Sequence, residues 1–225
     1  MHTFELPSGL EIELREMTGA EEELLTNQRL IRTGDAVNQA LKNCIVRLGD
    51  NDEPTVKDVL DLLSGDRLFI LVRLRQVSLG DEVELELTCP NTACRAANAV
   101  TVNLEELDVT LYGEEREFAF MLPGSGRKVR FGYLDGNKEK RLAALKEPSI
   151  SSAMLIRIVD VDGAQPTKKL MNDMSMRDRS ALRQEMLRVD AGIDTTVETD
   201  CESCGMRIRT RLEAEPGFLF PGVRL

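Results

Sequence analysis

Four of the five cysteines form two short pairs that lie far apart in the chain. Cys89 and Cys94 enclose four residues, and Cys201 and Cys204 enclose two. Thiolates in such pairs can surround one zinc ion tetrahedrally, with each sulfur about 2.3 Å from the metal. Four protein ligands leave no open position for water or substrate, so the ion would stabilise the fold rather than catalyse. The sequence therefore predicts one structural zinc site, whereas Cys44 is expected to pack in a core.

Other interpretations of the same cysteines stay open at this point. They could be unrelated free thiols, or the single Cys-x-x-Cys at Cys201 could be a redox pair, although no thioredoxin-like context surrounds it. Iron could also replace zinc at four thiolates, and it would reveal itself by its colour. The first pair has a longer spacing than the commonest zinc knuckle, yet the spacing is within the tolerated range.

The rest of the sequence offers little catalytic chemistry. His2 is the only histidine and lies in a segment expected to fray, which argues against a histidine-assisted nucleophile. The glycine-rich run at 123–127 lacks the Gly-Lys-Ser/Thr ending of a phosphate loop and is predicted to be a hairpin turn. We therefore expect no enzymatic activity and no small-molecule substrate.

Strands must carry the cysteine pairs, and helices precede those strands. Residues 82–88 and 195–200 alternate as strands that run into the first and second pair. Residues 66–77 are predicted to be a helix, because their counterpart 178–189 is rich in helix-forming residues. Further helices are expected over 21–43 and 53–63.

Several of these patterns occur twice. The hairpin pattern of residues 4–14, with its Leu-Pro-Ser-Gly turn, returns at 120–131, and the two cysteine pairs begin 112 residues apart. The sequence predicts an α+β fold of two related copies, residues 1–110 and 111–225, with the connection over 105–117. Each copy would hold a hairpin, helices and half of a zinc ribbon, joined at a pseudo-twofold axis.

Composition narrows the classes of partner. The net charge is −10, which disfavours binding to nucleic acid and to anionic membranes. No apolar run is long enough to span a bilayer and no signal peptide is recognised, so we expect a cytosolic protein with protein partners. The apolar residues Phe218, Leu219 and Phe220 lie between prolines and could dock on a partner, or they could fold back on the chain's own core.

Particular runs resemble a known family. They are Leu63–Phe69 (LSGDRLF), Gly80–Pro90 (GDEVELELTCP), Cys201–Gly205 (CESCG) and Pro216–Pro221 (PGFLFP). The chain resembles the baseplate hub assembly proteins of T-even-like contractile-tailed phages, a family also found in phage-derived contractile systems. This resemblance implies a non-enzymatic protein that binds other tail, hub or baseplate proteins. It would act in the host cytoplasm during assembly or in the tail baseplate of the virion.

A rival interpretation is a zinc-ribbon adaptor associated with nucleic acid. Arg207, Arg209 and Arg211 alternate along one strand after the second cysteine pair and would form a local basic stripe. Binding to DNA that weakens with salt would support this rival.

Overall fold

The alternating N-terminal residues form a hairpin whose second strand pairs with a later third strand. The computed structural model describes residues 1–212 and 218. The first sheet is antiparallel in the order β1-β2-β3, and Ile12 and Leu14 are fully buried on its inner face. Its strands are β1 (His2–Glu5), β2 (Glu11–Leu14) and β3 (Ile45–Leu48), and its helices are α1 (Gly19–Thr26), α2 (Gln28–Thr33), α3 (Asp35–Cys44), α4 (Val56–Asp61) and α5 (Ser64–Leu79).

Two predicted helices differ from the structure. The segment 21–43 is helical, as predicted, but it is broken into α1, α2 and α3. Asn27 interrupts it by capping α2 with its side chain, and Gly34 ends α2 at a φ of 70°, which is readily adopted by glycine. The helix expected over 53–63 is shorter, since Thr55 is the N-cap of α4. The helix predicted at 66–77 is confirmed within α5.

The second half has a similar order of elements around a separate hydrophobic cluster, with two helices between its second and third strands where the first half has three. Its sheet is antiparallel in the order β7-β8-β9. Val129 and Phe131 of the central strand are fully buried, as is Met171 in the same cluster. Its strands are β7 (Glu117–Met121), β8 (Lys128–Gly132) and β9 (Ile158–Val161), and its helices are α6 (Gly136–Ala143), α7 (Ile150–Leu155), α8 (Lys168–Asp173) and α9 (Met176–Val189). The predicted α+β class is confirmed.

Equivalent irregularities recur in the two halves. The register shifts after Glu13 in the first sheet and after Arg130 in the second. Asp66 accepts a hydrogen bond from a backbone N–H of the first hairpin turn, and Asp178 accepts two from the second turn. These shared details support the predicted duplication, which stays a prediction.

The segment between the halves is more ordered than a linker. It contains a short 3-10 helix, η1 (Leu104–Glu106), and the strand β6 (Val109–Thr110), which pairs with β10 (Gly192–Ile193) from the far end of the second half. A Cβ atom on Gly65 would lie 2.2 Å from the carbonyl oxygen of Ala191, so this close approach requires glycine. The strand pair therefore fixes the end of α9 against the start of α5.

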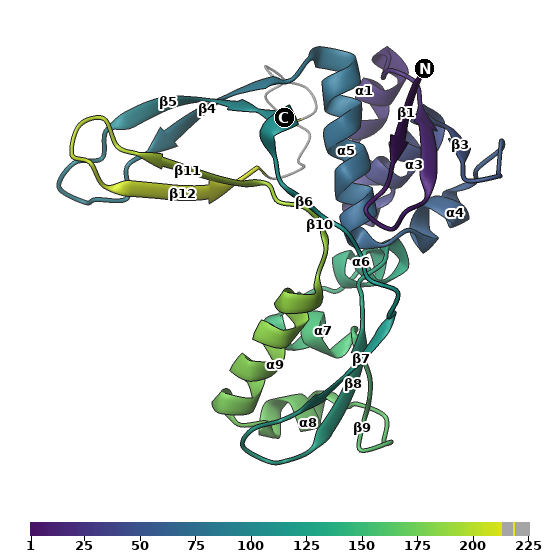
Figure 1. Cartoon of the computed structure of the whole chain (residues 1–225), viewed down its shortest axis with the longest axis vertical. Coiled ribbons are helices and arrows are strands. Elements are labelled where there is room, and N and C mark those ends of the chain that lie inside the picture. The colour runs from purple at the N-terminus through teal and green to yellow at the C-terminus, as the bar shows by residue number, and fades with distance from the viewer. Residues whose placement is uncertain (213–217, 219–225) are drawn as a thin grey trace.

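Helix α6 packs differently from its counterpart α1. In the first half, α1 packs on α3, whereas α6 packs on α4 and α5 of the other half. Ion pairs join Glu139 to Arg67 and Lys140 to Asp35 across this contact. The two halves are thus joined through α6 as well as through β6 and β10 (Figure 1).

Among the described helices, none is long and apolar enough to cross a membrane.

Candidate metal centre

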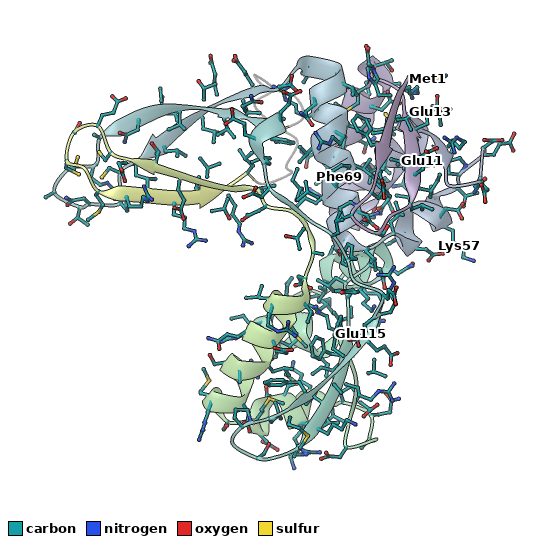
Figure 2. The ribbon with its side chains drawn as sticks, in the orientation of Figure 1. Met1, Glu11, Glu13, Lys57, Phe69 and Glu115 are labelled. Carbon is teal, nitrogen blue, oxygen red and sulfur yellow. The ribbon has the colours of Figure 1, made fainter. Side chains whose placement is uncertain are left out.

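Two hairpins, one from each half, carry the cysteine pairs. They are β4 (Glu82–Thr88) with β5 (Ala97–Asn103), and β11 (Thr196–Asp200) with β12 (Arg207–Arg211). The strands predicted at 82–88 and 195–200 are confirmed, the second starting one residue later than expected. Figure 1 shows the hairpins side by side as an arm that projects from the first half, and Figure 2 shows sulfur atoms at its outer tip.

The tip brings together the four sulfur atoms predicted to bind metal. The Sγ atoms of Cys89 and Cys204 lie 3.6 Å apart, and those of Cys94 and Cys201 lie 3.8 Å apart. All four lie within 4.8 Å of one another. Tetrahedral coordination with bonds of about 2.3 Å would place ligand sulfurs ~3.8 Å apart. The donor set and its spacing therefore fit a single zinc ion.

Backbone hydrogen bonds in each loop hold the cysteines at this spacing. The N–H of Cys89 donates to Ala96 across the base of the first loop, and the N–H of Cys94 donates to Asn91 within it. In the second loop, the N–H of Gly205 donates to the carbonyl of Cys201. These bonds close each loop into a tight turn.

The local environment affects the thiols unequally. Burial raises the pKa of Cys89 to about 12. Burial also acts to raise the pKa of Cys201, but hydrogen bonds from the backbone at Ser203 and Cys204 outweigh it and lower the pKa to about 6. A bound cation would favour the thiolate of every ligand, including the buried Cys89.

Asn98 is a buried residue of the site that the sequence analysis missed. Its side-chain amide donates to the carbonyls of Leu87 and Ala96 in its own hairpin, and its Oδ1 accepts from the N–H of Glu202 in the other hairpin. The residue is only 3% exposed. In the sequence it lies in an ordinary strand alternation, so no local signal distinguishes it from a solvent-facing asparagine.

Arg95 adopts a backbone conformation that suits glycine. It follows the second cysteine of its loop with a φ of 52°, and Gly205 follows the second cysteine of the other loop with a φ of 71°. We expect Arg95→Gly to raise the free energy of unfolding of the arm by about 1 kcal/mol, because a side chain is disfavoured there. Gly205→Ala should lower it by a similar amount. Thermal melts of the two variants check the prediction, and equal responses would contradict it.

The other residues singled out by sequence are not gathered at the arm tip. Phe218 is half-buried against the first hydrophobic cluster, and its carbonyl accepts a hydrogen bond from Nε of Arg75. Leu219 and Phe220 lie outside the described residues. The glycine-rich run at 123–127 forms the turn between β7 and β8, as predicted.

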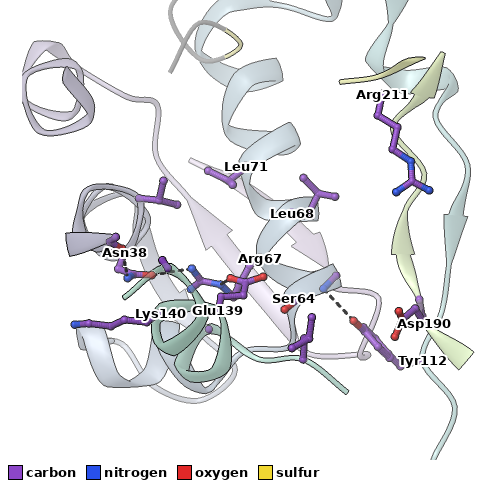
Figure 3. Close-up of a pocket in the computed structure, with 17 residues that line it drawn as sticks. Asn38, Ser64, Arg67, Leu68, Leu71, Tyr112, Glu139, Lys140, Asp190 and Arg211 are labelled. Carbon is purple, nitrogen blue, oxygen red and sulfur yellow. Dashed lines mark hydrogen bonds and ion pairs between the residues drawn. The ribbon is translucent and has the colours of Figure 1, made fainter. Parts of the chain in front are cut away.

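The basic stripe of the rival interpretation is partly neutralised. Arg207 forms ion pairs with Glu198 and Asp200, and Arg209 forms one with Glu198. Figure 3 places Arg211 at a cavity of about 560 Å³ between the halves, with Asp190 on the same side. Two of the three arginines are therefore compensated by carboxylates of the neighbouring strand, which weakens the case for a cationic face that binds nucleic acid.

Comparison with known proteins gives the family. Residues 1–214 match the family described as T4 bacteriophage base plate protein. The chain belongs to this family and is a structural component of a phage baseplate. No curated protein and no solved structure matches the chain at a significant level.

Proposed function

We propose that this chain is a non-enzymatic part or assembly factor of a contractile-tail baseplate and its central hub, acting through protein–protein contacts. The scaffold for these contacts would be stapled by one zinc ion at Cys89, Cys94, Cys201 and Cys204. The observation that carries the proposal is the gathering of these four sulfurs from two distant hairpins, in a member of a baseplate family.

The zinc ion would act by linking the two hairpins of the arm. Two ligands come from a hairpin that precedes the connection between the halves, and two come from a hairpin near the end of the chain. One ion would therefore close a long loop and hold the arm as a rigid unit. A rigid surface loses less conformational entropy when it binds a neighbouring protein. The filled coordination sphere favours this structural role over catalysis.

The partners would be other tail, hub or baseplate proteins, met in the host cytoplasm during assembly or in the tail baseplate of the virion. A nucleic-acid adaptor is the alternative, but the net charge of −10 and the paired arginines of β12 favour a protein partner.

Complementation tests the proposal in the phage or phage-derived system that encodes the chain. An amber mutation in its gene should yield lysates without complete baseplates by electron microscopy. The wild-type chain should restore them, and a Cys201→Ser/Cys204→Ser variant should not. Mass spectrometry of purified tails then separates a retained component from a transient assembly factor. Normal baseplates without the chain would overturn the proposal.

A further inference from the structure

The start of α5 is covered by a backbone segment from the second half. The N–H of Ser64 donates to the carbonyl of Leu134 at 3.0 Å, and the N–H of Gly136 donates to the carbonyl of Leu62 at 3.1 Å. These two bonds form a short antiparallel bridge centred on Leu63 and Asp135. The segment then enters α6, for which Asp135 is the N-cap.

Arg67 adds side-chain contacts beside this bridge, and Figure 3 shows it between Asn38 and Glu139. Nε of Arg67 donates to the carboxylate of Glu139 at 2.9 Å. Its Nη1 donates to the carbonyl of Val59, and its Nη2 donates to Oδ1 of Asn38. Nearby, the side-chain amide of Asn137 donates to the carboxylate of Asp61. The covered site thus recognises an extended segment followed by a helix with a carboxylate in its first turns.

The second half contains the same arginine arrangement, 112 residues later. Nη1 of Arg179 donates to the carbonyl of Met171 at 2.6 Å, and its Nη2 donates to Oγ of Ser151 at 3.0 Å. These contacts correspond to those of Arg67 with Val59 and Asn38. Among the described residues, however, no carboxylate pairs with Arg179. The position that Glu139 fills in the first half therefore has no counterpart.

The backbone edge beside Arg179 is also uncovered. Leu62 is buried, whereas its counterpart Met174 is half-buried, and the counterpart of Ser64 is Met176, which is 69% exposed. Within the described part of the chain, the carbonyl of Met174 and the N–H of Met176 have no backbone partner. A cavity of about 360 Å³ adjoins this edge, lined in part by Leu122, Met174 and Asp178.

One difference limits how far the likeness extends. Arg177 stands where the first half has Gly65, and Gly65 permits the close approach of Ala191 and Tyr112. The bulk of Arg177 prevents a second contact of that kind. A docked segment could therefore reproduce only the contacts that residues 134–139 make with the first half. These contacts are the backbone bridge and the ion pair with the carboxylate of the helix that follows.

We propose that the edge formed by Met174, Ser175, Met176 and Arg179 docks an extended segment leading into a capped helix, supplied by a neighbouring baseplate protein. The carboxylate of that helix pairs with Arg179, and an amide donor pairs with the exposed Asp173, as Asn137 does with Asp61. This inference rests on the proposed function for its partner. The chain's own segments of this type, 17–22 and 134–139, are already engaged, because α1 packs on α3 and α6 on α4 and α5.

A peptide with the sequence of residues 131–145 serves as the probe, added with a fluorescent label to the full-length chain. We expect saturable binding in fluorescence anisotropy and amide shift changes in NMR confined to Met174–Arg179. Met176→Pro should weaken binding by about tenfold or more, because proline removes the N–H of the bridge. Proline is well tolerated at this position, the first residue of a helix. A peptide with Glu139→Gln should bind up to about fivefold more weakly, since it loses a charged acceptor that is partly exposed in the first contact.

Lys168→Pro is the matched control. Lys168 is likewise the first residue of a helix, α8, and is not one of the four residues of the proposed edge, so this variant should bind the peptide like the wild type. Equal melting temperatures of the two proline variants would establish that Met176→Pro does not act through misfolding.

Three outcomes would overturn the inference. They are no binding at about 1 mM peptide, binding unaffected by Met176→Pro, and a wild-type dimer in ultracentrifugation that Met176→Pro dissociates, which would make a second copy the occupant. The peptide assay tests binding at this edge only, whereas complementation tests the proposed function. Either experiment can therefore fail while the other succeeds. In complementation, Met176→Pro should reduce baseplate assembly while its zinc content stays at the wild-type value.

Discussion

Cys204→Ser should release the metal and lower the melting temperature by about 6–12 °C. The side chain of Cys204 is exposed, and a surface substitution without a special role changes the free energy of unfolding by about 0.5 kcal/mol or less. A metal ligand behaves differently, because the free energy of zinc binding contributes directly to folding. We expect a loss of at least about 3 kcal/mol, and each kcal/mol shifts the midpoint of a chain of this size by about 2–4 °C.

Metal content and thermal melts measure this effect together. The purified wild-type chain should contain one zinc ion, and a chelator should lower its melting temperature to that of Cys204→Ser. Cys44→Ala is the matched control, because Cys44 is buried in the first hydrophobic cluster and burial raises its pKa to about 12. This variant should lose stability through packing but keep its zinc. A metal-free wild type with an unchanged melt in chelator would refute the staple.

The cysteine site was predictable because its signal is carried by residue type and spacing. The four residues had to meet if they bound one ion, and the sequence around each pair alternates as a strand. Asn98 could not be found in the same way, because its importance depends on a neighbour, Glu202, that is more than a hundred residues distant. Its role arises only when two hairpins lie together.

The helical segment of residues 21–43 shows a different limit of prediction from sequence. Its apolar spacing correctly predicts helix, but periodicity is insensitive to short interruptions at Asn27 and Gly34. The packing of α6 on the opposite half was equally invisible, since α1 and α6 occupy corresponding places in the sequence and differ only in what they contact. Local pattern thus predicted the elements, whereas long-range packing decided how the halves are joined.

Arg67→Met should lower the free energy of unfolding by about 3–5 kcal/mol. The arginine side chain is 7% exposed and donates to three acceptors from different elements. Methionine preserves much of the apolar stem but leaves the carbonyl of Val59 and Oδ1 of Asn38 without their donor, at a cost of about 1–3 kcal/mol each. Losing the ion pair with Glu139 adds to this cost. Urea denaturation of the variant measures the change.

Glu139→Gln separates the ion pair from the buried hydrogen bonds. The Glu139 side chain is 40% exposed, so its charge is partly screened and its removal should cost less than about 1 kcal/mol. Similar losses in the two variants would show that the ion pair, rather than the buried acceptors, stabilises the contact. A large loss in Arg67→Met alone would show that the hydrogen bonds to the buried acceptors, rather than the ion pair, stabilise the start of α5. Arg179 makes the corresponding hydrogen bonds in the second half, but among the described residues it pairs with no carboxylate.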